Sequence, residues 1–435
     1  MWKVKAILWA ILFLPLSGFG QLNSGAVSDW GGILTFWNPS LALDQEKGIN
    51  VSLAEIQSSF YNSAFSLDDI LSSSDGRNVI SFRQVVDQLS DKNRGIVETN
   101  IHTVGLQWRQ EKFAVGIGHR IRYIGDASYT DELIRLMSFG NGAFIGEEIE
   151  VGPGFSYAHY HELYLSAATQ WRGLSLGARI KVLAGSEYMG TSGSKISLTT
   201  EEDYYALSFS NNYSIESSGI FSYNGLNDVS LDFDPLRLQK MFTGNRGLAF
   251  DVGIALDIGD NSKLMLSYTD IGSIQWDLNT RRYVSEGDFV YEGIDILDYV
   301  ADNGSVVIAD SLYQLLQFGE TRDSEFDTTV PSQWSLGFKS SFGNKDMMTA
   351  IISGRSINSR TLISGLLGYN KKVSDTFSAS LTYAIYGKSF DNIGATAFFD
   401  FDIFRFYFGV ENIVNTFNAL GTRYGGFHMG FNLKL

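Results

Sequence analysis

The chain has 435 residues, with 45 Gly, 5 Pro and no Cys, and its formal net charge is −15. The lack of Cys excludes a disulfide scaffold, a zinc–thiolate or iron–sulfur centre, a cysteine nucleophile and a lipidated N-terminal cysteine. The acidic balance argues against nucleic-acid binding, because neutralising phosphates requires an excess of Lys and Arg. The apolar share of 44% is too high for a disordered chain.

The first twenty residues have the pattern of a cleaved secretory signal. Two lysines precede an apolar run over residues 6–16, and small residues stand at the −3 and −1 positions before Gln21. The run is too short for a transmembrane helix, and no later stretch is long and apolar enough to form one. We therefore expect cleavage after residue 20. The mature protein is then either soluble beyond the inner membrane or a membrane β-barrel.

Alternation of residue types favours the barrel. From Phe113 to Tyr123 the odd positions are mostly apolar, and the even positions are small or charged. The same alternation recurs at residues 174–182, 248–257, 333–339, 377–385 and 404–411. These patterns predict strands of roughly 9 to 12 residues, the length that crosses a bilayer at a tilt.

The predicted connections alternate between short and long, which is typical of outer-membrane barrels. Long connections lie near residues 62–95, 124–161, 224–246 and 273–331. Short turns are predicted at residues 110–112, 171–173, 210–212, 259–262, 343–346, 370–374 and 402–403. Together with a first strand at Gly48–Phe60 and a last one at Gly425–Leu435, seven turns give sixteen strands. Weak patterning over residues 195–223 leaves fourteen open.

The predicted fold class is therefore all-β, a single antiparallel transmembrane β-barrel of about 14–16 strands over residues 48–435. Residues 21–47 are expected to form a plug-like N-terminal segment. Short helices are expected in the loops at Asp131–Met137, Asp234–Phe242 and Asp310–Phe318, from capping residues or helical spacing. The chain ends inside an alternating strand with an apolar last residue, the pattern that barrel-insertion machinery reads.

The search for reactive groups yields no catalytic or cofactor site, and we expect no enzyme. His159 and His161 are the metal candidates, because two histidines two apart share one face of a strand, but no third ligand is visible. His119 and His102 fall on lipid-facing rows. His428 falls on the lumen row without an obvious acid partner.

Charged residues recur on the row opposite the apolar one. A charge on the lipid face would cost roughly 2–4 kcal/mol at mid-bilayer, so these side chains must point into the lumen. They either line a water-filled channel or pair across a filled interior. The candidate lumen residues are Arg120, Arg122, Arg179, Lys181, Asp251, Asp257, Lys339, Arg405 and Glu411.

Three stretches resemble known barrels. Phe36–Ser40 resembles the Asn-Pro-Ala element of FadL-type hydrophobic-solute transporters and the related PorV-like barrels, with Ser40 where Ala is usual. Two further stretches are similar to an uncharacterised outer-membrane barrel family of Bacteroidota, namely Asp270–Trp276 with Tyr291–Asp295, and Phe242–Gly253. This family is a domain of unknown function that spans nearly the whole mature chain. The resemblance implies a location and a fold, and it assigns no activity.

An outer-membrane enzyme would need a Ser or Asp–His cluster at the rim of the barrel. Beside that hypothesis, two functions remain open for a barrel in the cell outer membrane. The first is a passive channel or FadL-like transporter for a small solute, with Asn38 and Pro39 in the plug. The solute would be apolar if the resemblance to FadL-type transporters extends to what is transported. The second is a non-transporting scaffold for secretion, attachment or envelope integrity, with a filled lumen. The expected partners are outer-membrane lipid, a small-molecule solute and envelope proteins bound by the long outer loops, and no nucleic acid.

Overall fold

The computed structural model describes residues 32–74, 77–193, 195–224, 228–234, 236–291, 318–322, 324–343, 345–414 and 419–435. Three expectations therefore lie wholly or mostly outside the described residues. They are the signal peptide over residues 1–20, the first part of the plug-like segment, and the helix over residues 310–318.

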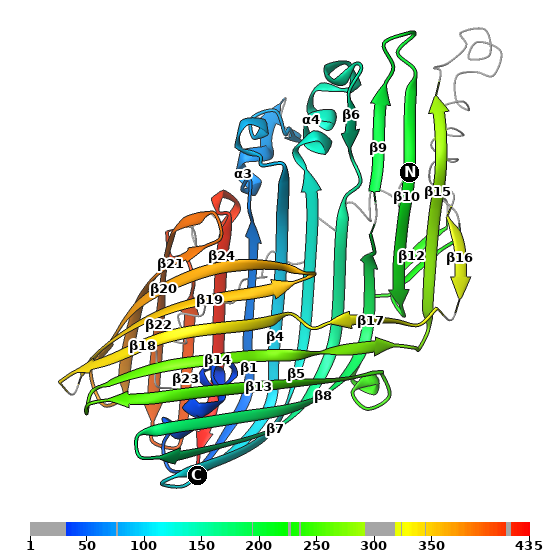
Figure 1. The fold of residues 1–435 in the computed structure, drawn as a ribbon. Coiled ribbons are helices and arrows are strands. Elements are labelled where there is room, and N and C mark those ends of the chain that lie inside the picture. Colours follow the sequence, from blue (N-terminus) through cyan, green and yellow to red (C-terminus); the bar gives the residue numbers. More distant parts are fainter. Residues whose placement is uncertain are drawn as a thin grey trace.

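Fourteen antiparallel strands close into a barrel within the described part of the chain (Figure 1). The strands are β1 (Gly48–Asn62), β4 (Lys92–Arg109), β5 (Phe113–Thr130), β7 (Gly154–Trp171), β8 (Leu174–Thr191), β13 (Asn245–Ile258), β14 (Ser262–Trp276), β18 (Ser332–Phe342), β19 (Asp346–Ile357), β20 (Arg360–Lys372), β21 (Phe377–Tyr386), β22 (Ser389–Phe401), β23 (Phe404–Val410) and β24 (Tyr424–Lys434). Closure comes from β1, which pairs with β4 on one side and β24 on the other. The predicted fold class is confirmed.

Six of the seven predicted short turns join neighbouring barrel strands, and the seventh is wrong. Residues 210–212 lie inside β10 (Leu207–Ser218), where Asn211 is paired with Ile196 of β9 (Lys195–Thr200) and Gly287 of β15 (Thr280–Tyr291). Its side-chain amide donates to the hydroxyl of Ser285 rather than to a turn backbone. Losing this turn removes two strands from the larger estimate, which leaves fourteen.

The strands β9, β10 and β15 belong to a sheet that extends beyond the barrel (Figure 1). The outer end of β8 pairs with β10, and β15 pairs with β16 (Gly319–Arg322). The short strand β6 (Glu148–Glu150) pairs with β9, and β17 (Phe326–Thr329) pairs with β14. Two small hairpins stand apart, β2–β3 (Leu71–Ser74 and Arg77–Ile80) and β11–β12 (Phe221–Tyr223 and Val229–Leu231).

The helices are short. The helix predicted at Asp131–Met137 is confirmed as α4 (Asp131–Phe139), capped by Thr130. In place of the helix predicted at Asp234–Phe242, the described residues of that region form a 3-10 turn, η5 (Leu238–Lys240). The others are α2 (Gly32–Trp37), η2 (Pro39–Leu43), α3 (Leu67–Ile70), η3 (Val86–Gln88), η4 (Asn141–Phe144) and η6 (Ala419–Gly421). No helix among the described residues is long and apolar enough to cross a membrane.

The outer wall of the barrel carries a belt of exposed apolar side chains. On β13, five residues of one row, from Leu248 to Leu256, are exposed, and the intervening Ala249 and Ala255 are buried. The belt continues on neighbouring strands through Val182, Leu266, Leu336, Ile352, Leu367 and Leu381. Large apolar side chains exposed in a continuous band mark a surface that another apolar phase covers.

Candidate functional site

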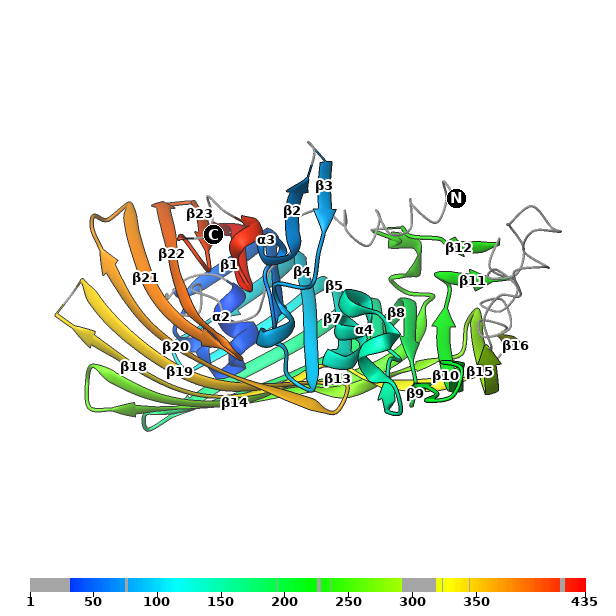
Figure 2. The same cartoon turned by 90° about the horizontal axis from the view of Figure 1, so that it is seen from above.

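The described part of the N-terminal segment, residues 32–47, lies inside the barrel (Figure 2). Asn38 is fully buried and caps η2, because its Oδ1 accepts from the Ser40 amide at 3.0 Å and the Ser40 hydroxyl at 2.7 Å. Its Nδ2 donates to the carbonyls of Ile254 on β13 and Leu266 on β14, each at 3.2 Å. Asn38 therefore ties the segment to two neighbouring strands of the wall.

The wall carries glycines where the segment contacts it. A Cβ added to Gly177 would lie 2.3 Å from the Ser40 amide nitrogen, and one added to Gly253 would lie 2.0 Å from Asn38 Oδ1. Both distances are too short for any side chain, so only glycine leaves room for the segment. Residues 38–40 fill a recess in the wall.

Polar groups of the wall also bind the backbone of the segment. Arg179 Nη2 donates to the Thr35 carbonyl at 2.9 Å, and Gln107 Nε2 donates to the Ala42 carbonyl at 3.0 Å. Residues 44–46 are held by ion pairs with Lys263, Lys339 and Arg405. Partial burial works against ionisation of Glu46, but the Lys434 hydrogen bond and the Arg405 charge lower its pKa.

The ring of Phe36 joins the segment to the charged centre of the lumen. The guanidinium carbons of Arg120 and Arg179 lie 3.9 and 4.5 Å from the ring centroid. The rings of His102 and Tyr164 approach it edge-on at 5.0 and 5.3 Å. Two stacked cations and two aromatic edges fix this side chain, since cation–π contacts strengthen where water is excluded.

The candidate lumen residues of β5 form a buried ion-pair network. Arg120 binds Glu162 through two hydrogen bonds of 3.1 and 2.7 Å. Arg122 lies 2.9 Å from a Glu98 oxygen and 2.8 Å from an Asp270 oxygen. These charges pair within the lumen instead of facing open water.

The network continues to the opposite wall. Lys181 lies 2.7 Å from an Asp251 oxygen and also pairs with Asp270, while Arg179 lies 2.9 Å from the other Asp251 oxygen. Arg355 of β19 reaches Glu98 of β4 at 2.6 Å. Because β4 and β19 lie on opposite sides of the ring of strands, this last pair crosses the lumen.

The remaining candidate lumen residues lie away from this network. Asp257 and Lys339 sit near residues 44–46, where Lys263 bridges Asp257 to Asp44. Arg405 pairs with Asp400 at 3.0 Å and with Glu46. They form a second charged layer at the end of the barrel that holds the C-terminus and the short turns (Figure 1).

Glu411, the ninth candidate, is the acid partner that the sequence did not reveal for His428. His428 Nδ1 lies 3.0 Å from Glu411 Oε1, and His428 Nε2 lies 3.0 Å from the Thr396 hydroxyl. The arrangement resembles a hydrolase triad, but a Cβ on Gly409 would lie 2.3 Å from His428 Nε2. The His428 ring therefore lies directly against the β23 backbone at Gly409 and is fully buried.

The prediction that His102 faces lipid is wrong. A β-bulge between His102 and Val104 shifts the pairing of β4 with β5 by one residue. The shift turns His102 inward, where it binds Glu55 at 2.9 Å and the Tyr164 hydroxyl at 3.0 Å. Val104 remains exposed on the outer wall. A bulge reverses the face of every residue beyond it.

His119 lies on the outer row as expected, and His159 and His161 share that outer face, but all three are buried under a loop. His119 Nε2 lies 3.1 Å from His161 Nδ1, and His159 Nδ1 lies 3.4 Å from Glu187. Across the described ranges, no group of three or more His, Asp or Glu residues has a geometry that could hold a metal ion. We assign no metal role to His159 or His161.

Several residues of the lumen network were missed from the sequence. Three of them lie on inward-facing rows: Glu98, Glu162 and Arg355. Glu98 could have been predicted from its alternation with outward-facing apolar residues such as Val97. Asp270 is different, because it sits in a bulge of β14 with a positive φ of 60°. Its backbone amide donates to Asp251 Oδ1 at 2.7 Å, a contact that no sequence period predicts.

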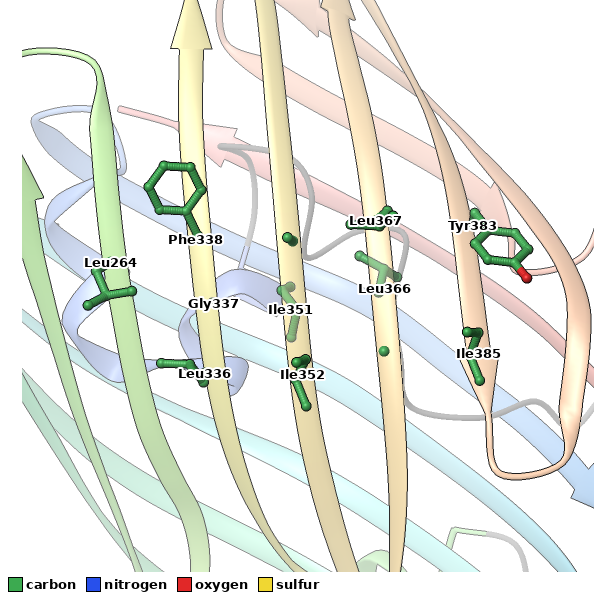
Figure 3. A pocket seen from close by; sticks show the side chains of 12 residues that line it. Leu264, Leu336, Gly337, Phe338, Ile351, Ile352, Leu366, Leu367, Tyr383 and Ile385 are labelled. Atoms are coloured by element: carbon green, nitrogen blue, oxygen red, sulfur yellow. The ribbon is translucent and has the colours of Figure 1, made fainter.

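A hollow of about 370 Å³ lies on the barrel wall over β14 and β18–β21 (Figure 3). Its rim consists of exposed belt side chains, among them Leu336, Ile352 and Leu367, and small residues Ala350 and Gly365 lie between them. Most of its lining residues lie on the outer row, so the hollow is part of the apolar belt.

Comparison with solved structures gives distant likenesses that cover nearly the whole chain. The toluene transporter TbuX of Ralstonia pickettii is 12% identical, with 96% of this chain and 97% of that chain covered and a TM-score of 0.46. A FadL homologue of Pseudomonas aeruginosa is 13% identical, with coverage of 94% and 95% and a TM-score of 0.43. The toluene transporter TodX of Pseudomonas putida is 10% identical, with coverage of 96% and 98% and a TM-score of 0.43.

No curated protein matches the chain. Residues 39–411 match a family described as a family of unknown function (DUF5723). The match begins at Pro39, next to the buried Asn38, and ends at Glu411, so it includes most of the barrel and all nine candidate lumen residues. On this match over most of its length, the chain belongs to the family of unknown function DUF5723.

Proposed function

We propose that this protein is an outer-membrane channel for a small solute, and that residues 32–47 close its lumen as a displaceable plug. The observation that carries the proposal is the recess formed by Gly177 and Gly253, which residues 38–40 occupy. Because glycines line that part of the wall, withdrawing the segment would leave a gap that no wall side chain fills. The exposed apolar belt supports a membrane location.

The bonds that hold the segment are of a kind that allows release. The polar contacts include single hydrogen bonds to backbone carbonyls and ion pairs at the end of the barrel. A net hydrogen bond in a protein contributes about 0.5–1.5 kcal/mol, so a change in a few such contacts shifts a closed–open equilibrium appreciably. Displacement of the segment is therefore compatible with an intact barrel.

A second candidate function is a non-transporting envelope scaffold. It is favoured by the Arg355–Glu98 pair, which crosses the lumen without help from the N-terminal segment. In that case the lumen would stay closed after the segment is removed. The sheet beyond the barrel would then supply a surface for envelope partners.

Single-channel conductance in planar bilayers separates the two functions. We expect the mature protein to conduct rarely and a variant lacking residues 22–47 to conduct steadily. Asn38→Ala removes two donors to the wall, which contribute about 1–3 kcal/mol together, and should raise the open probability roughly tenfold. Asn261→Ala, in an exposed turn, is the matched control and should leave the mature protein unchanged.

A deletion variant that is folded but silent would overturn the channel proposal and favour the scaffold. Folding is checked by the shift in gel mobility that barrels show on boiling. The Asn38→Ala variant adds an independent test, because the whole segment remains present in it.

A further inference from the structure

Residues 232–234 and 236–244, called here the outer-wall segment, cover part of the outside of the barrel. On β5 the outer row is exposed at Ile117 but buried at His119 and Ile121. On β7 the outer row changes in the same direction, from 57% exposed at Leu165 to fully buried at His161. The rows change where the segment begins to cover them.

Specific contacts fix the segment to the wall. The guanidinium of Arg237 forms an ion pair with Glu187 of β8, whose side chain is fully buried. The Asp234 amide donates to the same carboxylate at 3.2 Å, and the ring of Phe233 lies 6.1 Å from that of Tyr157 on β7. The inner side of the segment is therefore an ordered contact with the barrel.

The opposite side of the segment carries exposed apolar side chains. Phe242 is 77% exposed, and Leu236 and Leu238 are each about half exposed, at 48% and 56%. The segment leads directly into β13, where Leu248 begins the exposed apolar belt. The patch is thus continuous with a surface that an apolar phase covers.

Two cations accompany this patch. Arg246 is exposed on the outer row of β13, where it directly precedes Leu248. Lys240 is partly exposed at the end of η5. Neither forms an ion pair with any residue that the structure describes. The third cation, Arg237, is occupied by Glu187 and Asp232. Apolar side chains beside unpaired cations match a lipid surface whose headgroups carry phosphate.

We propose that the outer-wall segment lies in the outer-leaflet interface and binds phosphorylated lipid. Leu238 and Phe242 would enter the acyl region, while Lys240 and Arg246 would bind headgroup phosphates. The proposal rests on the membrane location argued above. It follows from the place of the segment at the end of the belt opposite the C-terminus and the short turns (Figure 1).

The chain contains no Cys, so single cysteines can carry an environment-sensitive fluorophore without further changes. We would label Phe242→Cys in the segment, Leu248→Cys in the belt and Tyr204→Cys, whose position is 95% exposed in the turn between β9 and β10. Each protein is folded into phosphatidylcholine vesicles with and without phosphatidylglycerol. Quenching by aqueous iodide and by spin-labelled lipid is then compared.

We expect labels at residues 242 and 248 to be quenched by lipid and several-fold protected from iodide relative to residue 204. We also expect phosphatidylglycerol to increase the protection at 242, and the added substitutions Lys240→Gln and Arg246→Gln to abolish that increase. If iodide quenched the label at residue 242 as strongly as the label at residue 204, while residue 248 stayed protected, the lipid contact of the segment would be overturned and the membrane location would stand. An unprotected label at 248 would instead overturn the membrane location. A label at 242 that ignores phosphatidylglycerol would overturn phosphate binding.

Discussion

The lumen network brings five cations and four carboxylates together as buried groups. The cations are Arg120, Arg122, Arg179, Lys181 and Arg355, and the carboxylates are Glu98, Glu162, Asp251 and Asp270. Removing charges from water is expensive, and only close pairing offsets the loss. Such a network adds little net stability, but it makes each member hard to replace, because its partners would remain buried without a counter-charge.

Glu162→Gln tests this dependence. The substitution keeps the size of the side chain but leaves Arg120 without its doubly bonded partner, and the side chain of Glu162 is fully buried. Removing one partner of a buried pair typically destabilises by about 3–5 kcal/mol. We expect a loss of this size in urea unfolding of the protein folded into vesicles.

Glu111→Gln is the matched control for that measurement. Glu111 pairs with Lys47 at 3.1 Å, but both side chains are largely exposed, and water screens the pair. Its loss should change the free energy of unfolding little. If Glu162→Gln proved no more harmful than Glu111→Gln, the lumen would have to contain enough water to solvate Arg120.

At the scale of elements, sequence alone predicts what a regular strand dictates. Alternation along β13 places Leu248 and Val252 outside and Asp251 inside, because a barrel wall has one apolar face and one polar face. The six short turns can be predicted for the same reason, because each one interrupts the alternation between two neighbouring strands. These features establish the fold class and the direction of most lumen charges.

What the sequence leaves out is every departure from regular pairing. The bulge at His102 reverses a face, and the bulge at Asp270 brings a second carboxylate beside Asp251. The sheet beyond the barrel uses the same strand-forming residues as the wall, so residues 207–218 carried no signal of their different place. Such features depend on neighbours distant in sequence, which a local period does not record.

Gly253→Ala tests the fit between wall and N-terminal segment. A Cβ at this position would lie 2.0 Å from Asn38 Oδ1, so the segment must move while β13 keeps an ordinary strand residue. We expect amides of residues 34–44 to exchange hydrogen several-fold faster in mass-spectrometric analysis, with the barrel strands unchanged.

The control is Gly142→Ala in η4, where an added Cβ meets no atom within 4 Å. It should leave exchange in residues 34–44 as in the parent protein. Unchanged exchange in Gly253→Ala would mean that the segment adjusts within the recess. The recess would then not be the feature that holds the plug.

At the scale of the whole molecule, the barrel wall separates a polar inside from an apolar outside. Charged pairs and the N-terminal segment fill its inside, and an apolar belt covers its outside, so the usual order of a water-soluble protein is reversed. This reversal makes sense only if the belt faces hydrocarbon. The extended sheet and α4 lie beyond the belt, at the end opposite the C-terminus (Figure 1).

Val252→Lys tests the environment of the belt. Val252 lies midway along the exposed row from Leu248 to Leu256 on β13. A lysine near the bilayer midplane of a barrel costs roughly 2–4 kcal/mol, and we expect a loss of that size in urea unfolding from lipid vesicles. Tyr204→Lys, in the turn between β9 and β10, should be close to neutral because that position is 95% exposed. Equal effects of the two lysines would show that the belt does not face lipid, and the membrane location would fall with it. A large loss confined to Val252→Lys would place the middle of β13 in the hydrocarbon core.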